Sequence, residues 1–476
     1  MNKLYYVVTV LTVLLFAGPV LGEVDKSPIN FVGSYEFNYA NEMKYLEQTV
    51  YEDVSQQRLG IWGTQETIVD ENLIFNMGLG GILWNPFPGN IFIDKLTNFN
   101  MLPVEVKMEY KFGDSKNSLM SLTFGQFFYK YNPDSKNLGE YIFRTISYPQ
   151  TVFTGNVDIA GSSQASVRGL MFSLNPFQGK FKNDFLITTE TNFAPLHDIS
   201  LAYVGSYNVK NVFQVGVGFS LDRLIPFRPS ETTPKNDKSL ILEVPEQTVN
   251  TVSGPVIVPA WTGVKKYWGN DSLNKTLASA GIDHPDSIPV KTETRLTFKS
   301  AKFMLMSSLD FKPLIGLQTE DGWQKDQFRL YTEIIVNGIA DQPFYYENIS
   351  HRTAYMWGIS LPTWKILDYF NFEIQYYPTK MPNNIQELFE FNHPAPYLRL
   401  PGMDERKYSP DSSIWKKNDF KWSIAAQRKV INGLTIMAQI ASDHFRPINN
   451  TFHNEFSEAL WKPSAWYFDI RVIYGI

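Results

Sequence analysis

The last eleven residues, WYFDIRVIYGI (466–476), alternate between two kinds of side chain, and this pattern constrains the fold more than any other feature. Phe468, Tyr474 and Ile476 fall on an apolar face, whereas Asp469 and Arg471 fall on the opposite face. A period of two is the signature of a β-strand. A long apolar strand at the edge of a sheet invites aggregation. The terminal pattern therefore predicts a closed barrel in which the last strand pairs with the first.

The first 22 residues, MNKLYYVVTVLTVLLFAGPVLG, have the pattern of a secretory signal peptide, residues 1–22, cut after Gly22. A retained N-terminal membrane anchor is the alternative. The chain has no cysteine, which excludes a lipoprotein anchor, disulfides and cysteine-type zinc sites. After residue 22 no stretch approaches the roughly 20 apolar residues of a membrane helix. Aromatic residues nevertheless reach 15%, as in a barrel whose strands bury alternate residues in lipid.

The same alternation recurs along residues 23–476, which we interpret as a single all-β domain, a transmembrane antiparallel up-and-down barrel. The clearest case is LPVEVKMEYKF (102–112), where four charged residues share one face, which suits a watery interior. The pattern predicts sixteen strands: 30–40, 57–68, 72–85, 102–112, 119–131, 165–174, 183–192, 198–209, 212–222, 292–311, 327–337, 351–361, 368–378, 420–428, 433–443 and 466–476.

The connections between these strands give an independent check. With the C-terminus on the periplasmic side, the turns on that side have about 2–15 residues, and those on the other side about 5–69. Short periplasmic turns and long external loops are typical of outer-membrane barrels. The longest predicted external loops are 223–291 and 379–419.

One segment, 292–311, does not fit a single regular strand. In 292–311 the apolar face changes from even to odd positions, so residues 299–302 must form a bulge or a tight turn. A turn there, with a further strand at 151–158, would give eighteen strands. Fourteen strands would follow if residues 23–68 formed a plug.

With these features in hand, the chain resembles Gram-negative porins over its whole mature length. Its last strand is similar to the signal that the barrel-assembly machinery reads; Ile476 replaces the usual final aromatic residue, while Phe468 and Tyr474 keep the pattern. Two stretches, KYNPDSKNLGEYIFRTISYP (130–149) and LPTWKILDYFNFEI (361–374), also resemble uncharacterised outer-membrane barrels of fibre-degrading anaerobes. This looser similarity implies no substrate.

Porins narrow their lumen with an in-folded external loop whose acidic residues face basic residues on the wall. The resemblance implies that residues 132–164 form this loop. Its candidate constriction residues are Asp134, Lys136, Glu140, Arg144 and Asp158. Asp134 is expected to cap a short helix that runs through Arg144. The candidate pore-lining residues are Glu105, Lys107, Glu109, Lys111, Arg168, Arg295, Arg329 and Arg471. The alternatives are a solvated loop helix, or an ion pair inside the lumen that only stiffens the barrel.

The resemblance implies a passive diffusion channel for small hydrophilic solutes in the outer membrane. The alternative is a non-conducting barrel whose external loops bind a ligand, a glycan or a neighbouring cell. The six histidines lack metal-ligand spacing, so neither an enzyme nor a cofactor is expected. The net charge of −5 gives no nucleic-acid footprint. Expected partners are outer-membrane lipid and lipopolysaccharide, the barrel-assembly machinery and the solutes. Whether the barrel forms a homo-trimer stays open.

Overall fold

The computed structural model describes residues 25–26, 28–45, 49–85, 98–113, 118–143, 165–176, 180–190, 196–210, 212–229, 241–244, 247–251, 254–258, 261–264, 291–292, 299–317, 326–336, 349–364, 366–378, 419–442 and 465–475. The predicted signal peptide, 1–22, lies outside these residues. Nine long strands from β2 to β10 and seven from β16 to β22 make a wall of sixteen.

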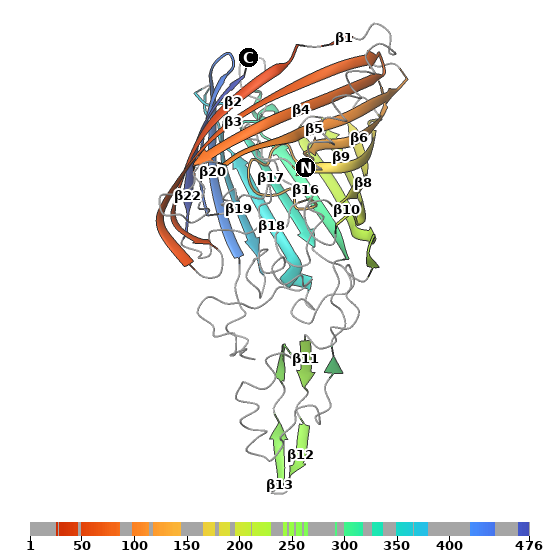
Figure 1. The fold of residues 1–476 in the computed structure, drawn as a ribbon, viewed down its shortest axis with the longest axis vertical. Helices are drawn as coiled ribbons and strands as arrows, with labels where there is room; N and C mark the ends of the chain where they lie inside the picture. The colour runs from red at the N-terminus through yellow and green to blue at the C-terminus, as the bar shows by residue number, and fades with distance from the viewer. Residues whose placement is uncertain are drawn as a thin grey trace.

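The first half of the wall consists of β2 (Asn30–Tyr45), β3 (Thr49–Asp70), β4 (Leu73–Asn85), β5 (Asn98–Phe112), β6 (Met120–Tyr129), β7 (Ala165–Leu174), β8 (Phe181–Thr189), β9 (Ile199–Val209) and β10 (Phe213–Ile225). The second half consists of β16 (Ser300–Asp310), β17 (Arg329–Val336), β18 (Thr353–Ser360), β19 (Tyr369–Tyr377), β20 (Asp419–Ile431), β21 (Leu434–Ala441) and β22 (Tyr467–Gly475). Figure 1 shows these strands wrapped side by side into one cylinder.

Each wall strand pairs antiparallel with the next wall strand along the chain. The cylinder closes where β22 pairs with β2, from Val32 opposite Gly475 to Ala40 opposite Tyr467. The prediction of an all-β, up-and-down barrel of sixteen strands is confirmed. The fourteen-strand alternative is wrong because β2 and β3 belong to the wall rather than to a plug.

The segment where the apolar face changes parity, predicted as strand 292–311, divides into two parts. Its wall strand β16 begins only at Ser300, and from there odd positions such as Phe303 and Leu305 face outward. Residues Lys291–Thr292 form β15, which pairs with β11 (Ile241–Val244) outside the wall. No turn interrupts β16, which stays paired with β10 from Ser300 to Leu309, so the eighteen-strand alternative is wrong as well.

The first predicted external loop is shorter than expected. β2 continues to Tyr45 and β3 begins at Thr49, with pairing maintained up to this last pair of residues. The predicted strands had ended at residue 40 and restarted at residue 57. The β2–β3 hairpin therefore extends beyond its neighbours: β22 pairs with β2 only as far as Ala40, and β4 reaches β3 only as far as Gln57. At the other end of β3, the two-residue strand β1 (Asp25–Lys26) pairs with Ile68 and Thr67.

The two ends of the barrel differ. At the end that holds the C-terminus the connections are short, such as residues 71–72, 210–212 and 432–433. At the opposite end, the segment between β10 and β16 carries two small sheets, one of β11, β14 (Trp261–Val264) and β15, the other of β12 (Gln247–Thr251) and β13 (Gly254–Val258). Figure 1 shows both sheets well beyond the rim of the barrel.

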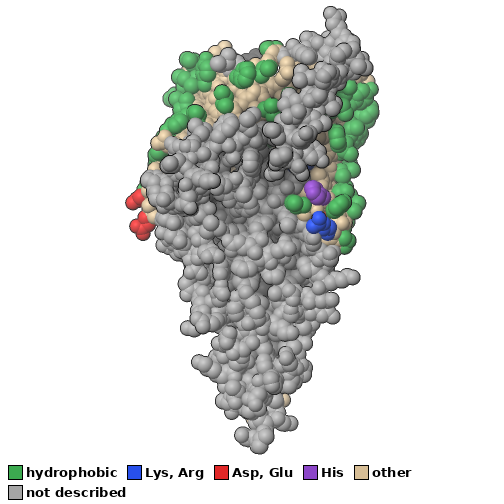
Figure 2. Space-filling view, viewed as in Figure 1, with side chains coloured by type: hydrophobic (Ala, Val, Ile, Leu, Met, Phe, Trp, Pro, Cys, Tyr) green, Lys and Arg blue, Asp and Glu red, His purple; other side chains and the backbone are tan. Residues whose placement is uncertain are grey.

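The outer face of the wall is apolar. Ile61, Phe124, Phe185 and Tyr474 each expose between 49% and 59% of their surface, and Figure 2 shows apolar side chains spread over the visible wall. The alternate positions face inward and carry the buried polar residues, such as Asn371, Glu373 and Gln375 of β19. This arrangement matches a strand with lipid on one side and an internal space on the other. No helix within the described residues is long and apolar enough to cross a membrane.

Candidate pore constriction

Residues 130–143, which follow β6, enter the interior of the barrel, and we call them the inner segment. They form bends and turns, without the expected helix after Asp134. Leu138, Tyr141 and Ile142 are each at most 1% exposed. An irregular backbone inside a barrel needs partners for its N–H and C=O groups, because each unpaired buried group costs about 1–3 kcal/mol.

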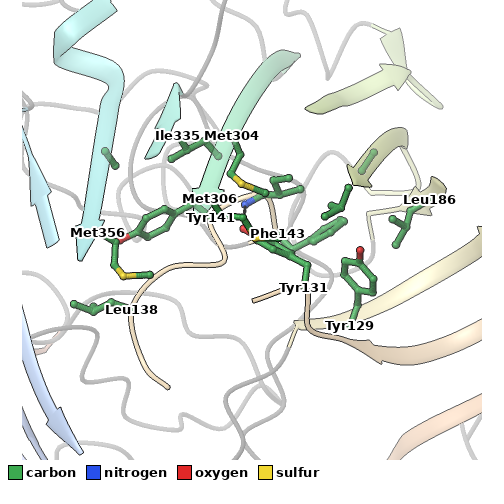
Figure 3. Packing of buried hydrophobic residues seen from close by; sticks show 14 of the residues in the cluster. Tyr129, Tyr131, Leu138, Tyr141, Phe143, Leu186, Met304, Met306, Ile335 and Met356 are labelled. Atoms are coloured by element: carbon green, nitrogen blue, oxygen red, sulfur yellow. Dashed lines mark hydrogen bonds between the residues drawn. The ribbon is translucent and has the colours of Figure 1, made fainter. Parts of the chain in front are cut away.

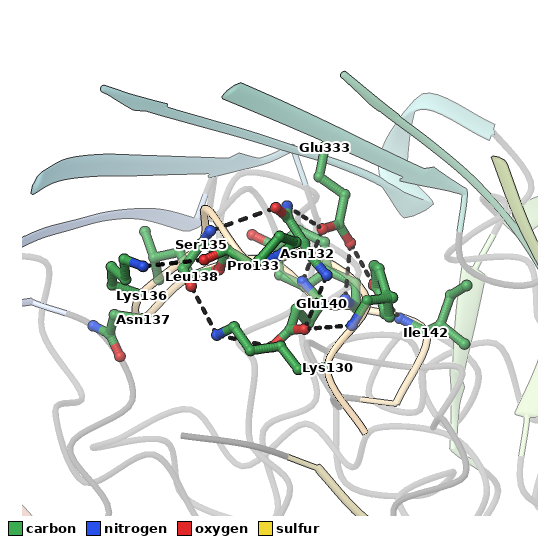
Figure 4. A network of polar contacts seen from close by, with 12 residues as sticks. Lys130, Asn132, Pro133, Ser135, Lys136, Asn137, Leu138, Glu140, Ile142 and Glu333 are labelled. Carbon is green, nitrogen blue, oxygen red and sulfur yellow. Dashed lines mark hydrogen bonds and ion pairs between the residues drawn. The ribbon is translucent and has the colours of Figure 1, made fainter. Parts of the chain in front are cut away.

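Glu333, near the middle of β17, supplies one set of these partners (Figure 4). Its Oε1 accepts hydrogen bonds from the Tyr131 hydroxyl at 2.7 Å and the Tyr141 N–H at 2.9 Å. Its Oε2 accepts from the Glu140 N–H at 2.9 Å and the Asn132 side-chain amide at 3.4 Å. One wall carboxylate thus binds the inner segment at four points.

Glu373 on β19 does the same for the tip of the inner segment. It accepts the N–H groups of Lys136 at 2.7 Å, Asn137 at 2.9 Å and Leu138 at 2.8 Å. The Tyr331 hydroxyl donates a fourth hydrogen bond, at 2.7 Å. Three consecutive backbone N–H groups point at one carboxylate, so this turn of the inner segment binds the Glu373 side chain as it would bind an anion. Neither Glu333 nor Glu373 was predicted as a site residue.

The Tyr131 side chain shows how strongly this region is shielded. Burial, together with the nearby carboxylates of Glu333 and Glu140, raises the pKa of the Tyr131 phenol well above its ordinary value. The phenol therefore stays protonated across the neutral range and keeps donating its hydrogen bond to Glu333.

Apolar packing holds the other side of the inner segment. Figure 3 shows Tyr141 and Phe143 among Met304, Met306 and Ile335, which project inward from the wall. Glycines on β10 make room for this packing: a Cβ at Gly218 would lie 2.3 Å from Cδ1 of Ile142 and 2.7 Å from Cε of Met304. The inner segment thus fills the space beside Gly218.

The acidic residues predicted at the constriction point into the wall. Asp134 pairs with the Arg329 guanidinium at 2.9 Å and accepts from the Ser308 hydroxyl at 2.5 Å. Glu140 accepts the N–H groups of Tyr131 and Asn132 at 3.1 and 3.3 Å. Both side chains are almost fully buried, so they fasten the segment rather than line an opening.

The other predicted constriction residues have different positions. Lys136 lies 2.7 Å from the carboxylate of Asp326, in the connection that precedes β17, and its Nζ lies 5.1 Å from the centre of the Tyr369 ring. Arg144 and Asp158 lie outside the described residues.

Most of the predicted pore-lining residues that the structure describes face the interior. On β5, Lys107 pairs with Glu105 at 2.8 Å, and Glu109 and Lys111 follow on the same face. On β22, Arg471 lies 3.7 Å from Glu36 and also pairs with Asp469. Arg329 faces inward against Asp134. Arg295 lies outside the described residues.

Arg168 was predicted on the pore wall, and the structure corrects this. On β7, Val167 and Ser173 are the buried, inward-facing positions, so Arg168 shares the outer face with Leu170 and Phe172. Its Nε donates to the side-chain oxygen of Gln126 at 2.8 Å, across the β6–β7 pair.

The residues predicted as an assembly signal lie on the closing strand. Phe468 stacks on Tyr39 of β2 with ring centres 5.4 Å apart, and Tyr474 is exposed on the outer face. Ile476 lies outside the described residues. Their recognition by the assembly machinery stays a prediction.

A second buried polar group lies where β8, β9 and β10 reach the end of the barrel opposite the C-terminus. Arg223 is fully buried, with its guanidinium 3.6 Å from Glu190 and 3.7 Å from Asp198. Its backbone N–H donates to the Ser200 hydroxyl at 2.7 Å. The three charged side chains are each 0% exposed, so bulk water does not reach these ion pairs.

Gly358 on β18 offers a test of how the Glu373 contact is held. A Cβ there would lie 2.1 Å from Cε2 of Tyr331, an atom of a rigid ring. Gly358→Ala must therefore push the ring aside and break the hydrogen bond that the Tyr331 hydroxyl donates to Glu373. We expect a loss of about 1–3 kcal/mol, the usual cost of overpacking. Urea unfolding in lipid vesicles measures it. Gly33→Ala is the matched control, since its nearest neighbours would be 3.9 and 4.0 Å away. Equal midpoints for both variants would contradict the expectation.

Comparisons with known proteins add little to these observations. No family model and no curated protein matches the sequence. Similar solved structures include a triple mutant of Rhodopseudomonas blastica porin (8% identity, TM-score 0.38), a variant of the Rh. blastica porin with five substitutions (7%, 0.40) and a structure described as "Asymmetric conductivity of engineered proteins" (8%, 0.39). Each alignment covers 95% of this chain and 100% of the other.

At these identities and TM-scores the likeness carries no argument beyond what the strand pairing shows. By its own pairing, the chain is a closed barrel of sixteen antiparallel strands.

Proposed function

We propose that this protein is a passive channel of the outer membrane that lets small hydrophilic solutes diffuse through a narrowed lumen. The observation that carries the proposal is the inner segment, which is fastened by Glu333 and Glu373 to one side of a wall with an apolar exterior. A segment anchored to one side narrows the passage and leaves the opposite wall to line it. Such a channel needs no catalytic group.

The side of the wall formed by β2, β5 and β22 supports this reading. Its inward-facing residues include charged ones, such as Glu36, Lys107 and Arg471. Charged side chains keep an internal space wet, and their field sets which solutes pass. A barrel built only as a rigid scaffold has no need of such a surface.

Single-channel recording tests the proposal. The whole exported protein, purified from membranes and reconstituted in a planar bilayer, is expected to give discrete, ohmic current steps. A protein whose folding is verified by its heat-dependent mobility on a gel, but which never conducts, would refute a passive channel.

One observation favours a second candidate function. The two small sheets between β10 and β16 lie beyond the external rim, where they could contact a ligand, a glycan or another cell. Deletion of residues 241–264 separates the two candidates. A channel keeps its conductance after this deletion, whereas a binding barrel loses its attachment to glycan or to cells.

A further inference from the structure

Several ion pairs of the interior share one asymmetry: the cation is the more exposed partner. For Lys130 and Glu140 the exposed fractions are 23% and 4%, and for Lys182 and Asp184 they are 48% and 2%. Arg471, at 15%, covers Asp469 at 2%. The pairs Arg329–Asp134 and Lys107–Glu105 have the same order. Because these side chains face inward, their exposed surface is what a solute in the lumen meets.

The carboxylates are held back by hydrogen bonds from the wall side. Glu140 accepts two N–H groups of the inner segment. Asp184 accepts the hydroxyls of Tyr129 at 2.9 Å and Ser173 at 2.7 Å, and Glu36 accepts the Asn38 amide at 2.7 Å. These donors fix the negative charge behind the cation. Since the Coulomb energy falls with distance, the nearer cation dominates the potential felt by a passing solute.

The cations come from separate parts of the interior. Lys107 lies on β5 and Arg471 on β22. Lys130 belongs to the inner segment and, as Figure 4 shows, projects to the side away from Glu333. The positive surface therefore extends over both the constricting segment and the wall, rather than forming one isolated patch.

Three described pairs have the opposite order; in one of them, Lys302–Asp222, both side chains are at most 1% exposed, and the other two are near the end of the barrel that holds the C-terminus. Asp326, at 37%, is more exposed than Lys136, and Asp310, at 12%, is more exposed than Lys312. Asp326 and Lys312 belong to the connection between β16 and β17. The two carboxylates that are clearly more exposed than their partners, Asp326 and Asp310, thus lie at one mouth of the barrel.

We propose that the constriction selects for small anionic solutes over cations of similar size, with Lys107, Lys130 and Arg471 as the residues that determine this specificity. The inference rests on the proposed channel function. The chemistry that fits is a small hydrophilic solute with a carboxylate or phosphate group, attracted by three cations that are each more exposed than their partner carboxylates.

The experiment is the reversal potential of the reconstituted, full-length protein in a potassium chloride gradient. We expect chloride to be about twofold or more as permeant as potassium, with acetate in place of chloride also carrying current. The variant Lys107→Gln, Lys130→Gln, Arg471→Gln is expected to bring the ratio to one or below. Lys210→Gln, which removes an exposed cation from the turn between β9 and β10, is the control and should keep the wild-type ratio.

The outcomes separate the two proposals. Current steps with a preference for potassium in the wild-type protein would overturn the anion inference and leave the channel intact. A ratio that is unchanged in the triple variant would also overturn it. Complete absence of current would overturn the channel proposal itself. The wild-type ratio decides the matter even where a variant does not fold.

Discussion

Replacing Glu333 and Glu373 together with alanine is expected to raise single-channel conductance and to free the inner segment from the wall. The two carboxylates accept eight hydrogen bonds, seven of them from residues 131–141 and one from Tyr331. Each donor left buried without a partner costs about 1–3 kcal/mol. Without the two carboxylates, the free-energy cost of moving the inner segment into the water of the lumen is therefore lower than the cost of keeping it against the wall.

Two measurements test this prediction. Current recordings should show larger and noisier open levels, and limited proteolysis should cut within residues 131–143, which the wild-type wall protects. Glu109→Ala is the matched control, because it removes an inward-facing carboxylate from β5. Glu333→Gln should give an intermediate result, since its amide keeps one acceptor oxygen but brings a donor toward other donors. Wild-type conductance and protease protection in the double variant would show that the carboxylates do not hold the segment.

Replacing Arg223 with methionine is expected to destabilise the barrel by about 3–5 kcal/mol, the usual cost of breaking a buried ion pair. Glu190 and Asp198 are fully buried, and without the guanidinium their charges face each other across the end of β8 and the start of β9. Urea unfolding in lipid vesicles, followed by tryptophan fluorescence, measures the loss.

The control for this prediction removes all three charges at once. The variant Arg223→Met, Glu190→Gln, Asp198→Asn should recover most of the lost stability, because a neutral, hydrogen-bonded group of similar volume avoids the desolvation of charges. If the triple variant is as unstable as Arg223→Met alone, packing of the arginine side chain rather than its charge holds this rim. Channel activity should remain in the triple variant, since the group lies apart from the inner segment's two wall carboxylates.

Alternation was enough to predict the wall, because lipid and water impose opposite demands on successive residues of a strand. Strand 198–209, for instance, matches β9 (Ile199–Val209) closely. The rule failed where a strand leaves the membrane: the β2–β3 hairpin continues to Tyr45 and Thr49, beyond the barrel, where one face no longer meets lipid. Arg168 shows a different failure. Its parity with Leu170 and Phe172 pointed outward, but its charge favoured the interior.

The constriction was harder to predict, and the reason is chemical. Acidic residues in the predicted loop and basic residues on the wall do meet, as in Asp134 and Arg329. The more numerous contacts run the other way: backbone N–H groups of the inner segment donate to carboxylates on the wall. Every residue except proline has that donor, so no residue type marks it. Glu333 and Glu373 could have been singled out only as single carboxylates on the inward faces of β17 and β19.

The pairing of β22 with β2 also determines the order of assembly. Trp466 accepts from the Asn41 N–H at 3.1 Å, so the last segment of the chain is joined to one that was synthesised more than 400 residues earlier. Contacts of such separation form late, since a long loop must close first. Until then both β2 and β21 present open edges that could pair with other chains. Until the nine-residue strand β22 pairs with β2 and closes the cylinder, these edges must therefore be kept from pairing with other chains.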